Sequence, residues 1–443
     1  MEAQEYKGVW WRPSQPDFKV AGILYYVPGE EIRLELIGTF DTEHKDTIAV
    51  ILDAKSEDVL HGQASDGTNI TLFDNLCHIK HAGRAQFATV DYKAREIAFG
   101  MHLDSLDDKR FFKAEVRIPE LSYWLYPAAV QHTFENTENG HGIYVKFEDQ
   151  KTEDREVAKI EIKKGLSACL CRNASFQSGE FSFNPAFEQF TTFQIESKKE
   201  TSLKELYVAA VRFERFLSLA TLREVGFSEL RLFSKEYYFH ITKEKISFKP
   251  VFVDTTFHQK PSTTKIEKHR FLFDYNNIAT QYPKAIKKWY ANDQKFDAIR
   301  GHFLDSIDYH GPFSYINFLV VIQAVEGYGT RYLRKEISAY RKTLPKEVKT
   351  KKLHDILSVI FHHYSDVKIV NQDTDLEAIV ETRNYHSHLL PHRGKKCVDG
   401  FELYDLTDEL RRVLICCILT YLGFTNKEID QLTNNCYSDI IRR

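Results

Sequence analysis

Six consecutive residues near the C-terminus, 383–388, combine side chains that suit cleavage of a phosphodiester without a metal. Arg383 carries a permanent positive charge that can hold a phosphate and stabilise the charge that develops in the transition state. His388 follows after four intervening residues and can act as a general acid or base near neutral pH. Asn384 can orient the phosphate or the histidine. Because the 2′-hydroxyl of RNA supplies a nucleophile, these residues predict an RNA-cleaving site with no metal and no other cofactor.

The motif lies near the end of a predicted helix over 373–390. The residues Thr374-Asp375-Leu376-Glu377 fit a capping box at the start of this helix, and Pro391 is expected to stop it just after the motif. Arg383 lies on the same side as the predicted core-facing stripe of Leu376, Ile379 and Val380. Because an unpaired buried charge costs several kcal/mol, on the order given by studies of buried ion pairs, Arg383 needs a partner, a groove or a subunit interface.

The motif also has a plainer interpretation. An Arg and a His near a helix end interact with the last carbonyls and with the helix dipole, and this spacing is common. Two observations favour a catalytic role for the motif. Asn384 directly follows Arg383, and the segment from Arg331 to Lys352 contains nine basic residues and only two glutamates. That tract fits either a solvated loop or a surface that follows RNA phosphates. The predicted RNA-binding residues are Arg341, Lys342, Lys349, Lys351 and Lys352.

The chain divides into a β-rich part and a helical part. Short alternating runs such as 32–37, punctuated by turns such as Pro28-Gly29, indicate an antiparallel sandwich or barrel. After about residue 280 the period becomes helical, with predicted helices at 296–308, 313–340, 351–364, 373–390 and 406–422, the last closed by Gly423. We predict an α+β multidomain chain with a β-rich N-terminal domain (1–150), a mixed β/α continuation (151–270) and an all-α bundle (271–443).

Composition limits the class of protein. The net charge of −3 over 443 residues argues against general coating of nucleic acid but leaves room for a local basic patch. The longest apolar run, 413–422, is about half of what a bilayer-spanning helix needs, and the acidic start of the chain does not resemble a signal peptide. Seven scattered cysteines fit reduced thiols. We therefore predict a cytoplasmic protein that does not bind a membrane.

One set of residues could bind zinc instead. Cys77-His78-x-x-His81 and Cys169-x-Cys171 supply suitable ligand types. The sequence lacks paired C-x-x-C motifs, however, so buried thiols are the simpler interpretation and we expect no metal site.

The motif and its surroundings resemble a known family. Arg383-Asn384-x-x-x-His388 in a C-terminal helical domain resembles the HEPN (higher eukaryotes and prokaryotes nucleotide-binding) ribonucleases, and 323–328 resembles the second helix of a subset of them. The N-terminal half resembles the ApeA-type abortive-infection proteins of bacterial antiphage defence. The matching stretches are 8–13, 20–24 and 61–67 with Thr71 and Leu72.

The resemblance implies a specific site. HEPN domains are four-helix bundles that pair, so that two motif helices form one composite site in a homodimer or higher homo-oligomer. They cut RNA without a metal, and ApeA-like members are toxins that arrest an infected cell, with tRNA among the candidate substrates. Carried over, Arg383 and His388 are the catalytic pair, Asn384 is the polar neighbour and Glu326 is a partner for Arg383. His386 departs from the pattern as a second imidazole, and the family spacing favours His388.

The N-terminal region is expected to be a sensing or regulatory module, with a phage-derived protein or ligand as its trigger. Two other functions stay open. The helical domain could be a non-catalytic RNA-binding or dimerisation adaptor beside a ligand- or protein-binding β domain. Alternatively, a carbohydrate- or peptide-binding β domain could carry a helical appendage. RNA binding without cleavage favours the first alternative, and an aromatic-lined cleft in the N-terminal half favours the second.

Overall fold

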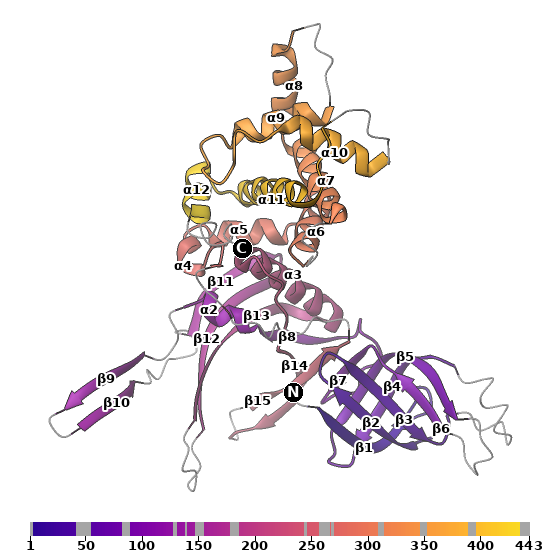
Figure 1. Ribbon diagram of the computed structural model, residues 1–443. Helices are drawn as coiled ribbons and strands as arrows, with labels where there is room; N and C mark the ends of the chain where they lie inside the picture. The colour runs from indigo at the N-terminus through magenta and orange to yellow at the C-terminus, as the bar shows by residue number, and fades with distance from the viewer. Residues whose placement is uncertain are drawn as a thin grey trace. The chain divides into compact units, whose positions relative to one another are not determined.

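The alternating runs of the N-terminal part form antiparallel strands in the computed structural model (Figure 1). The structure describes residues 3–40, 55–81, 89–126, 131–137, 140–146, 155–177, 186–242, 246–256, 266, 270–308, 314–345, 352–388 and 396–434. Among these residues one sheet has the strand order β11-β12-β13-β8-β14-β15-β7-β5-β4-β1-β2-β3-β6, and β9 and β10 form a separate pair. The bounds are β1 Gln4–Trp11, β2 Val20–Val27, β3 Glu31–Ile37, β4 Glu57–Ala64, β5 Asn69–His81, β6 Thr89–Lys93, β7 Glu96–Phe99, β8 Lys109–Arg117, β9 Gln131–Thr137, β10 Gly140–Lys146, β11 Glu156–Lys163, β12 Leu166–Gln177, β13 Ala186–Ser202, β14 Glu229–His240 and β15 Ile246–Thr255.

The long strand β5 closes part of this sheet into a barrel. Along one edge β5 pairs with β4. Along its other edge it pairs first with β7 and then, beyond Asp74, with β6. Asp74 has a φ of 50°, a left-handed conformation that residues with a Cβ adopt only at some cost, and it lies where the partner changes. The path β5-β4-β1-β2-β3-β6 and back to β5 is a six-stranded barrel, so the predicted barrel is confirmed.

Side chains fill the barrel. Its interior contains a buried cluster that includes Trp10, Leu24, Leu34 and Leu72, all fully buried. Trp10 lies in register with Gly62 on the neighbouring strand. A Cβ on Gly62 would come within 2.2 Å of the indole ring, so only glycine leaves room for this tryptophan. Two of the stretches that resemble ApeA proteins are therefore adjacent strands whose residues pack together.

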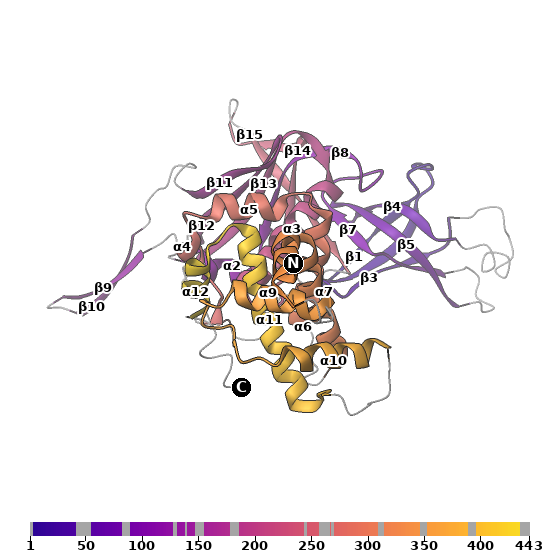
Figure 2. The same cartoon turned by 90° about the horizontal axis from the view of Figure 1, so that it is seen from above.

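The C-terminal part is helical, as predicted. Its described helices are α4 Tyr275–Ile278, α5 Tyr282–Tyr290, α6 Gln294–Asp308, α7 Tyr315–Tyr332, α8 Arg334–Thr343, α9 Lys352–His363, α10 Leu376–His388, α11 Gly400–Leu422 and α12 Asn426–Asn434. Two more helices, α2 Pro119–Trp124 and α3 Leu203–Thr221, lie between strands of the β-rich part. Helix α11 contacts α5, α6, α7 and α12, and Figure 2 shows it passing beside α6 and α7. Its segment 413–419 is buried on every side, as expected of a central helix. It ends at Gly423, which has a φ of 106°.

The prediction of one helix over 313–340 is wrong. Helix α7 ends before Leu333, whose φ of −113° and ψ of 25° lie outside helical geometry, and α8 begins directly afterwards. The Leu333 side chain is buried, so packing holds the break in place although the sequence keeps a helical period. Helix α8 buries only Ile337 of its own side chains, and Figure 1 shows it projecting from the other helices of its unit.

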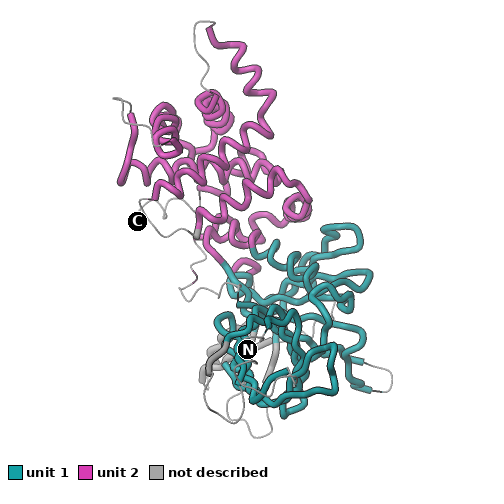
Figure 3. The backbone as a smooth tube through the Cα atoms, turned by 90° about the vertical axis from the view of Figure 1, so that its right-hand side faces the viewer, with its two compact units in different colours: residues 1–122, 127–214, 225–263 teal, residues 123–126, 215–224, 264–443 magenta. Residues whose placement is uncertain are grey.

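The chain folds into two compact units, coloured separately in Figure 3. The first comprises residues 1–122, 127–214 and 225–263, and the second comprises 123–126, 215–224 and 264–443. Within the second unit, Trp124 and Phe216 pack their rings against Tyr282, with centroids 5.9 and 6.2 Å away. The division into 1–150, 151–270 and 271–443 stays a prediction. Of the helices that the structure describes, none is long and apolar enough to cross a bilayer.

Candidate active site

Helix α10 spans Leu376–His388 within the predicted range 373–390, and its capping residue lies one position later than the sequence suggested. Asp375, rather than Thr374, caps it, since the Asp375 carboxylate accepts a hydrogen bond from the Ala378 N–H at 2.9 Å. Thr374 instead donates its hydroxyl to the Asn371 carbonyl at 2.7 Å. The predicted capping box is therefore wrong by one position. Hydrogen bonds from Lys396 and from the Ala378 N–H lower the pKa of Asp375, as expected of a carboxylate at a helix N-terminus.

Arg383 lies between two helices near the other end of α10. Its Nη2 is 3.3 Å from Glu326 Oε2 on α7, and its Nη1 donates to Asn384 Oδ1 at 3.3 Å. The predicted contact between Arg383 and Glu326 is confirmed. The two side chains are 26% and 22% exposed, so the ion pair contributes about 1 kcal/mol or less. Its main effect is to fix where the guanidinium points, while its catalytic role stays a prediction.

The two histidines of the motif lie in different surroundings. His386 stacks on Tyr315 of α7, with ring centroids 5.3 Å apart and planes at 6°. His388 is the exposed last residue of α10, at an end that extends past α6 and α7 (Figures 1 and 2). With about 100° of rotation per residue, His386 projects about 60° from Arg383 around the helix, and His388 about 140° from it. One chain therefore does not direct Arg383 and His388 to the same side. Pro391, the predicted stop, lies outside the described residues.

The predicted RNA-binding residues do not form one uniform surface. Arg341 on α8 is paired with Asp355 on α9, with Nε and Oδ2 2.7 Å apart, and that carboxylate is almost completely buried. Much of the charge of Arg341 is thus compensated within the fold. Lys342, in the last turn of α8, and Lys352, the first residue of α9, are exposed. Lys349 and Lys351 lie outside the described residues.

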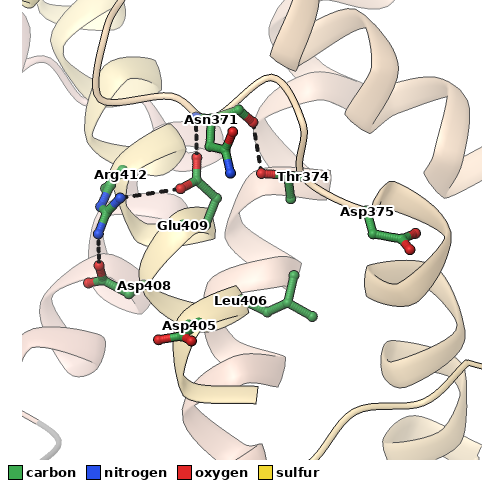
Figure 4. A pocket seen from close by; sticks show the side chains of 8 residues that line it. All are labelled: Asn371, Thr374, Asp375, Asp405, Leu406, Asp408, Glu409 and Arg412. Carbon is green, nitrogen blue, oxygen red and sulfur yellow. Dashed lines mark hydrogen bonds and ion pairs between the residues drawn. The ribbon is translucent and has the colours of Figure 1, made fainter. Parts of the chain in front are cut away.

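An acidic hollow of about 320 Å³ lies at the opposite end of α10 from the motif (Figure 4). Among the described residues that line it, Arg412 is the one cation, and it pairs with Asp408 and, at 3.3 Å, with Glu409. Burial raises the pKa of Glu409, although the Asn371 N–H donates to that carboxylate at 2.8 Å. The excess of carboxylates repels phosphate, so this hollow does not suit an RNA backbone. Its lining residues are Asn371, Thr374, Asp375, Asp405, Leu406, Asp408, Glu409 and Arg412.

The zinc ligands considered from the sequence do not form a metal cluster within the described part of the chain. There, no group of three or more His, Cys, Asp or Glu side chains could hold a metal ion. Cys169 and Cys171 are both buried on β12, with their Sγ atoms 3.4 Å apart.

Family comparisons agree with this architecture. The model described as ApeA N-terminal domain 1 matches residues 5–289, and the model described as Apea-like HEPN matches residues 319–428. The two matches thus define the class of the chain, which is a HEPN domain that follows an ApeA N-terminal domain. The chain belongs to the ApeA-type HEPN proteins, because the first model alone covers more than half of it. No curated protein and no solved structure matches the chain.

The HEPN match includes Glu326 and the whole 383–388 motif. A HEPN domain suggests a ribonuclease of the ApeA defence type, with an RNA substrate and, usually, dimerisation. Tyr315 precedes the match. Nothing in the sequence marks Tyr315 beyond an aromatic residue at a helix start, since its stack on His386 joins residues 71 positions apart.

Proposed function

We propose that the chain is a metal-independent endoribonuclease that acts as an abortive-infection toxin in bacterial antiphage defence. The observation that carries this proposal is the placement of Arg383. Within a HEPN domain, Glu326 and Asn384 orient its half-buried guanidinium. The helix that bears it ends in an exposed His388. Cellular RNA, with tRNA as one candidate, is the substrate.

The residues suit transfer of the phosphoryl group to the neighbouring hydroxyl. The RNA 2′-oxygen attacks phosphorus as the bond to the 5′-oxygen breaks, which leaves a 2′,3′-cyclic phosphate and a 5′-hydroxyl. A general base takes the proton from the 2′-oxygen, and a general acid returns one to the 5′-oxygen. His388 in either role contributes about 10²–10⁴-fold. Arg383 stabilises the negative charge on the non-bridging oxygens, and Asn384 and Glu326 hold it in place.

A second copy of the chain completes this site. Arg383 and His388 project from α10 about 140° apart, and one chain supplies a single His388 for two proton transfers. Two α10 helices that face each other supply two histidines, one as the base and one as the acid, beside two arginines. A homodimer or higher homo-oligomer is therefore part of the proposal.

The β-rich region senses the trigger in this proposal, and a phage-derived protein fits it better than a small ligand. The barrel interior is filled by its own side chains, so a trigger must contact the outside. Exposed apolar side chains lie at the adjoining ends of β14 and β15, on both faces of this strand pair, because successive residues of a strand project to opposite faces. Exposed apolar side chains of this kind suit contact with another protein. They are Tyr238, Phe239, Ile241 and Ile246, each 44–52% exposed.

RNA cleavage in the presence of a chelator tests the proposed chemistry. Purified protein is expected to cut RNA in EDTA and to leave 2′,3′-cyclic phosphate ends. Arg383→Ala and His388→Ala should each lower the rate by at least about 100-fold and relieve growth arrest in cells, with an unchanged circular dichroism spectrum. Ser387→Ala is the matched control, because Ser387 is exposed in the same turn and has no assigned role. If both variants remain fully active, the proposed catalytic pair is wrong.

A non-catalytic adaptor is the second candidate. The ion pair between Arg383 and Glu326 also fits this function, because an arginine with a purely architectural role would make the same contact. In that case the protein binds RNA or dimerises without cutting, and Arg383→Ala lowers the unfolding temperature. The adaptor would be supported if the wild-type protein binds RNA but leaves it uncut, even after extract from phage-infected cells is added.

A further inference from the structure

An exposed aromatic ring lies beside the motif on the neighbouring helix. Tyr315, the first residue of α7, is 52% exposed. The His386 ring lies against part of one face in a nearly parallel, offset stack, and no second ring lies against the other face among the described residues. Among the described residues the Tyr315 hydroxyl makes no hydrogen bond. The stack on His386 is thus the one ring contact of Tyr315 among the described residues.

Helix α10 presents two different groups to α7. His386 lies one turn after Arg383 and projects only about 60° from it. His386 contacts Tyr315, and Arg383 contacts Glu326. Because Tyr315 and Glu326 are eleven residues apart on one helix, their backbones lie about 16 Å apart along its axis. An aromatic surface and an oriented cation thus occupy successive positions along the same pair of helices.

Aromatic rings next to basic groups bind single-stranded nucleic acid. Every base has a flat π face that stacks on such a ring, and the phosphates meet the cation. In a duplex, neighbouring bases already cover both faces of each base. A free aromatic face therefore selects bases in loops, bulges or single strands.

We infer that the face of Tyr315 opposite His386 stacks an unpaired base of the RNA while Arg383 holds a phosphate of the same strand. The inference rests on the proposed ribonuclease function and adds its substrate class, which is RNA with unpaired bases at the cleavage site. Tyr315 is a specificity-determining residue, and His386 is a positioning residue that backs the ring. This assignment explains why a histidine other than His388 stands inside the motif.

Binding measurements separate stacking from catalysis. The full chain carrying His388→Ala, which the proposed mechanism makes inactive, is titrated into a fluorescent hairpin RNA with an unpaired loop and into a fully paired duplex. Tyr315→Leu keeps an apolar side chain that favours the helix but removes the ring. It should weaken hairpin binding by about 5- to 150-fold, the effect of losing one stacked base, and leave duplex binding unchanged. Tyr315→Phe keeps the ring and should bind within about twofold of the parent.

Ile316 supplies the matched control. It is the next residue of α7, equally exposed at 53%, and its side chain cannot stack on a base. Ile316→Ala should leave hairpin binding unchanged, and neither Ile316→Ala nor Tyr315→Leu should change the oligomeric state measured by sedimentation.

Each other outcome overturns the inference. Equal weakening by Ile316→Ala and Tyr315→Leu, or dissociation of the oligomer by Tyr315→Leu, would mean that this surface is an apolar contact between copies of the chain. If the Tyr315→Leu variant binds the hairpin as tightly as its parent while the wild-type protein cleaves RNA, the stacking is refuted and the ribonuclease proposal stands. A wild-type protein that neither binds nor cleaves RNA refutes both.

Discussion

The substitution Gly329→Ala tests how closely α7 must approach α9. Helix α7 also carries Tyr315 and Glu326. A Cβ on Gly329 would lie 2.4 Å from Ile356 Cγ2 and 3.1 Å from Ile360 Cδ1, whereas carbon atoms in contact usually lie about 3.5–4.0 Å apart. Both isoleucines are buried, and protein interiors are close-packed, so a new methyl group there forces neighbouring atoms to shift. Overpacking costs about 1–3 kcal/mol, and the severity of this clash places Gly329→Ala in the upper part of that range. The better helix propensity of alanine offsets about 1 kcal/mol, so the expected net loss of stability is about 1–2 kcal/mol.

Gly327 on the same helix provides the control. The nearest atoms to a Cβ there are 3.8 Å away, so Gly327→Ala gains the helix propensity without a clash and should stabilise by about 0.5–1 kcal/mol. The two variants should differ by about 1.5–3 kcal/mol in urea unfolding, or by about 3–12 °C in the thermal transition of the helical unit. If Gly329→Ala stabilises as much as Gly327→Ala, the close approach of α7 and α9 is wrong.

Three further predictions concern the motif helix. Glu326→Gln should tighten RNA binding at low salt, because it removes a negative charge beside the phosphate-binding arginine, and should lower stability by less than about 1 kcal/mol; unchanged affinity at low salt contradicts the assignment. Asp375→Ala should cost about 1 kcal/mol near neutral pH through loss of the cap. Because the Lys396 hydrogen bond lowers the folded-state pKa of Asp375, this stabilisation is present above about pH 4 and is lost as the pH falls through the lowered value. The urea unfolding midpoints of the wild type and the variant should therefore differ less at about pH 3 than at about pH 7, and an equal difference at both pH values would refute this role of Asp375. His386→Phe should retain RNA cleavage whereas His388→Phe should lose about 10²–10⁴-fold, and the reverse ranking would make His386 the catalytic histidine.

The sequence predicts best where local rules decide. The alternation of the strands, the helical second half and the Gly423 stop all depend on residues close together in the chain, and each is present. The partner of Arg383 was also predictable, because a charge on a core-facing stripe needs a counter-charge and Glu326 lay in a helix that resembled HEPN domains.

The remaining features depend on distant contacts. The break at Leu333 interrupts a continuous helical period because that side chain is buried. The switch of β5 from one partner to another depends on a left-handed Asp74, which no local pattern marks. The basic tract predicts a charged surface, but Arg341 is bound by Asp355 from the next helix. The stack of Tyr315 on His386 likewise exists only once α7 and α10 have met.

The helical unit is assembled from three separate stretches of the chain, 123–126, 215–224 and 264–443. Trp124 is completely buried there, with ring centroids 6.2 Å from Phe216 and 5.7 Å from Tyr275. A gene fragment that encodes 264–443 therefore specifies the entire HEPN match but omits two aromatic side chains from the core that supports it. Deleting the residues before 264 is therefore expected to weaken the packing of the helical unit, although the deletion leaves the HEPN match itself whole.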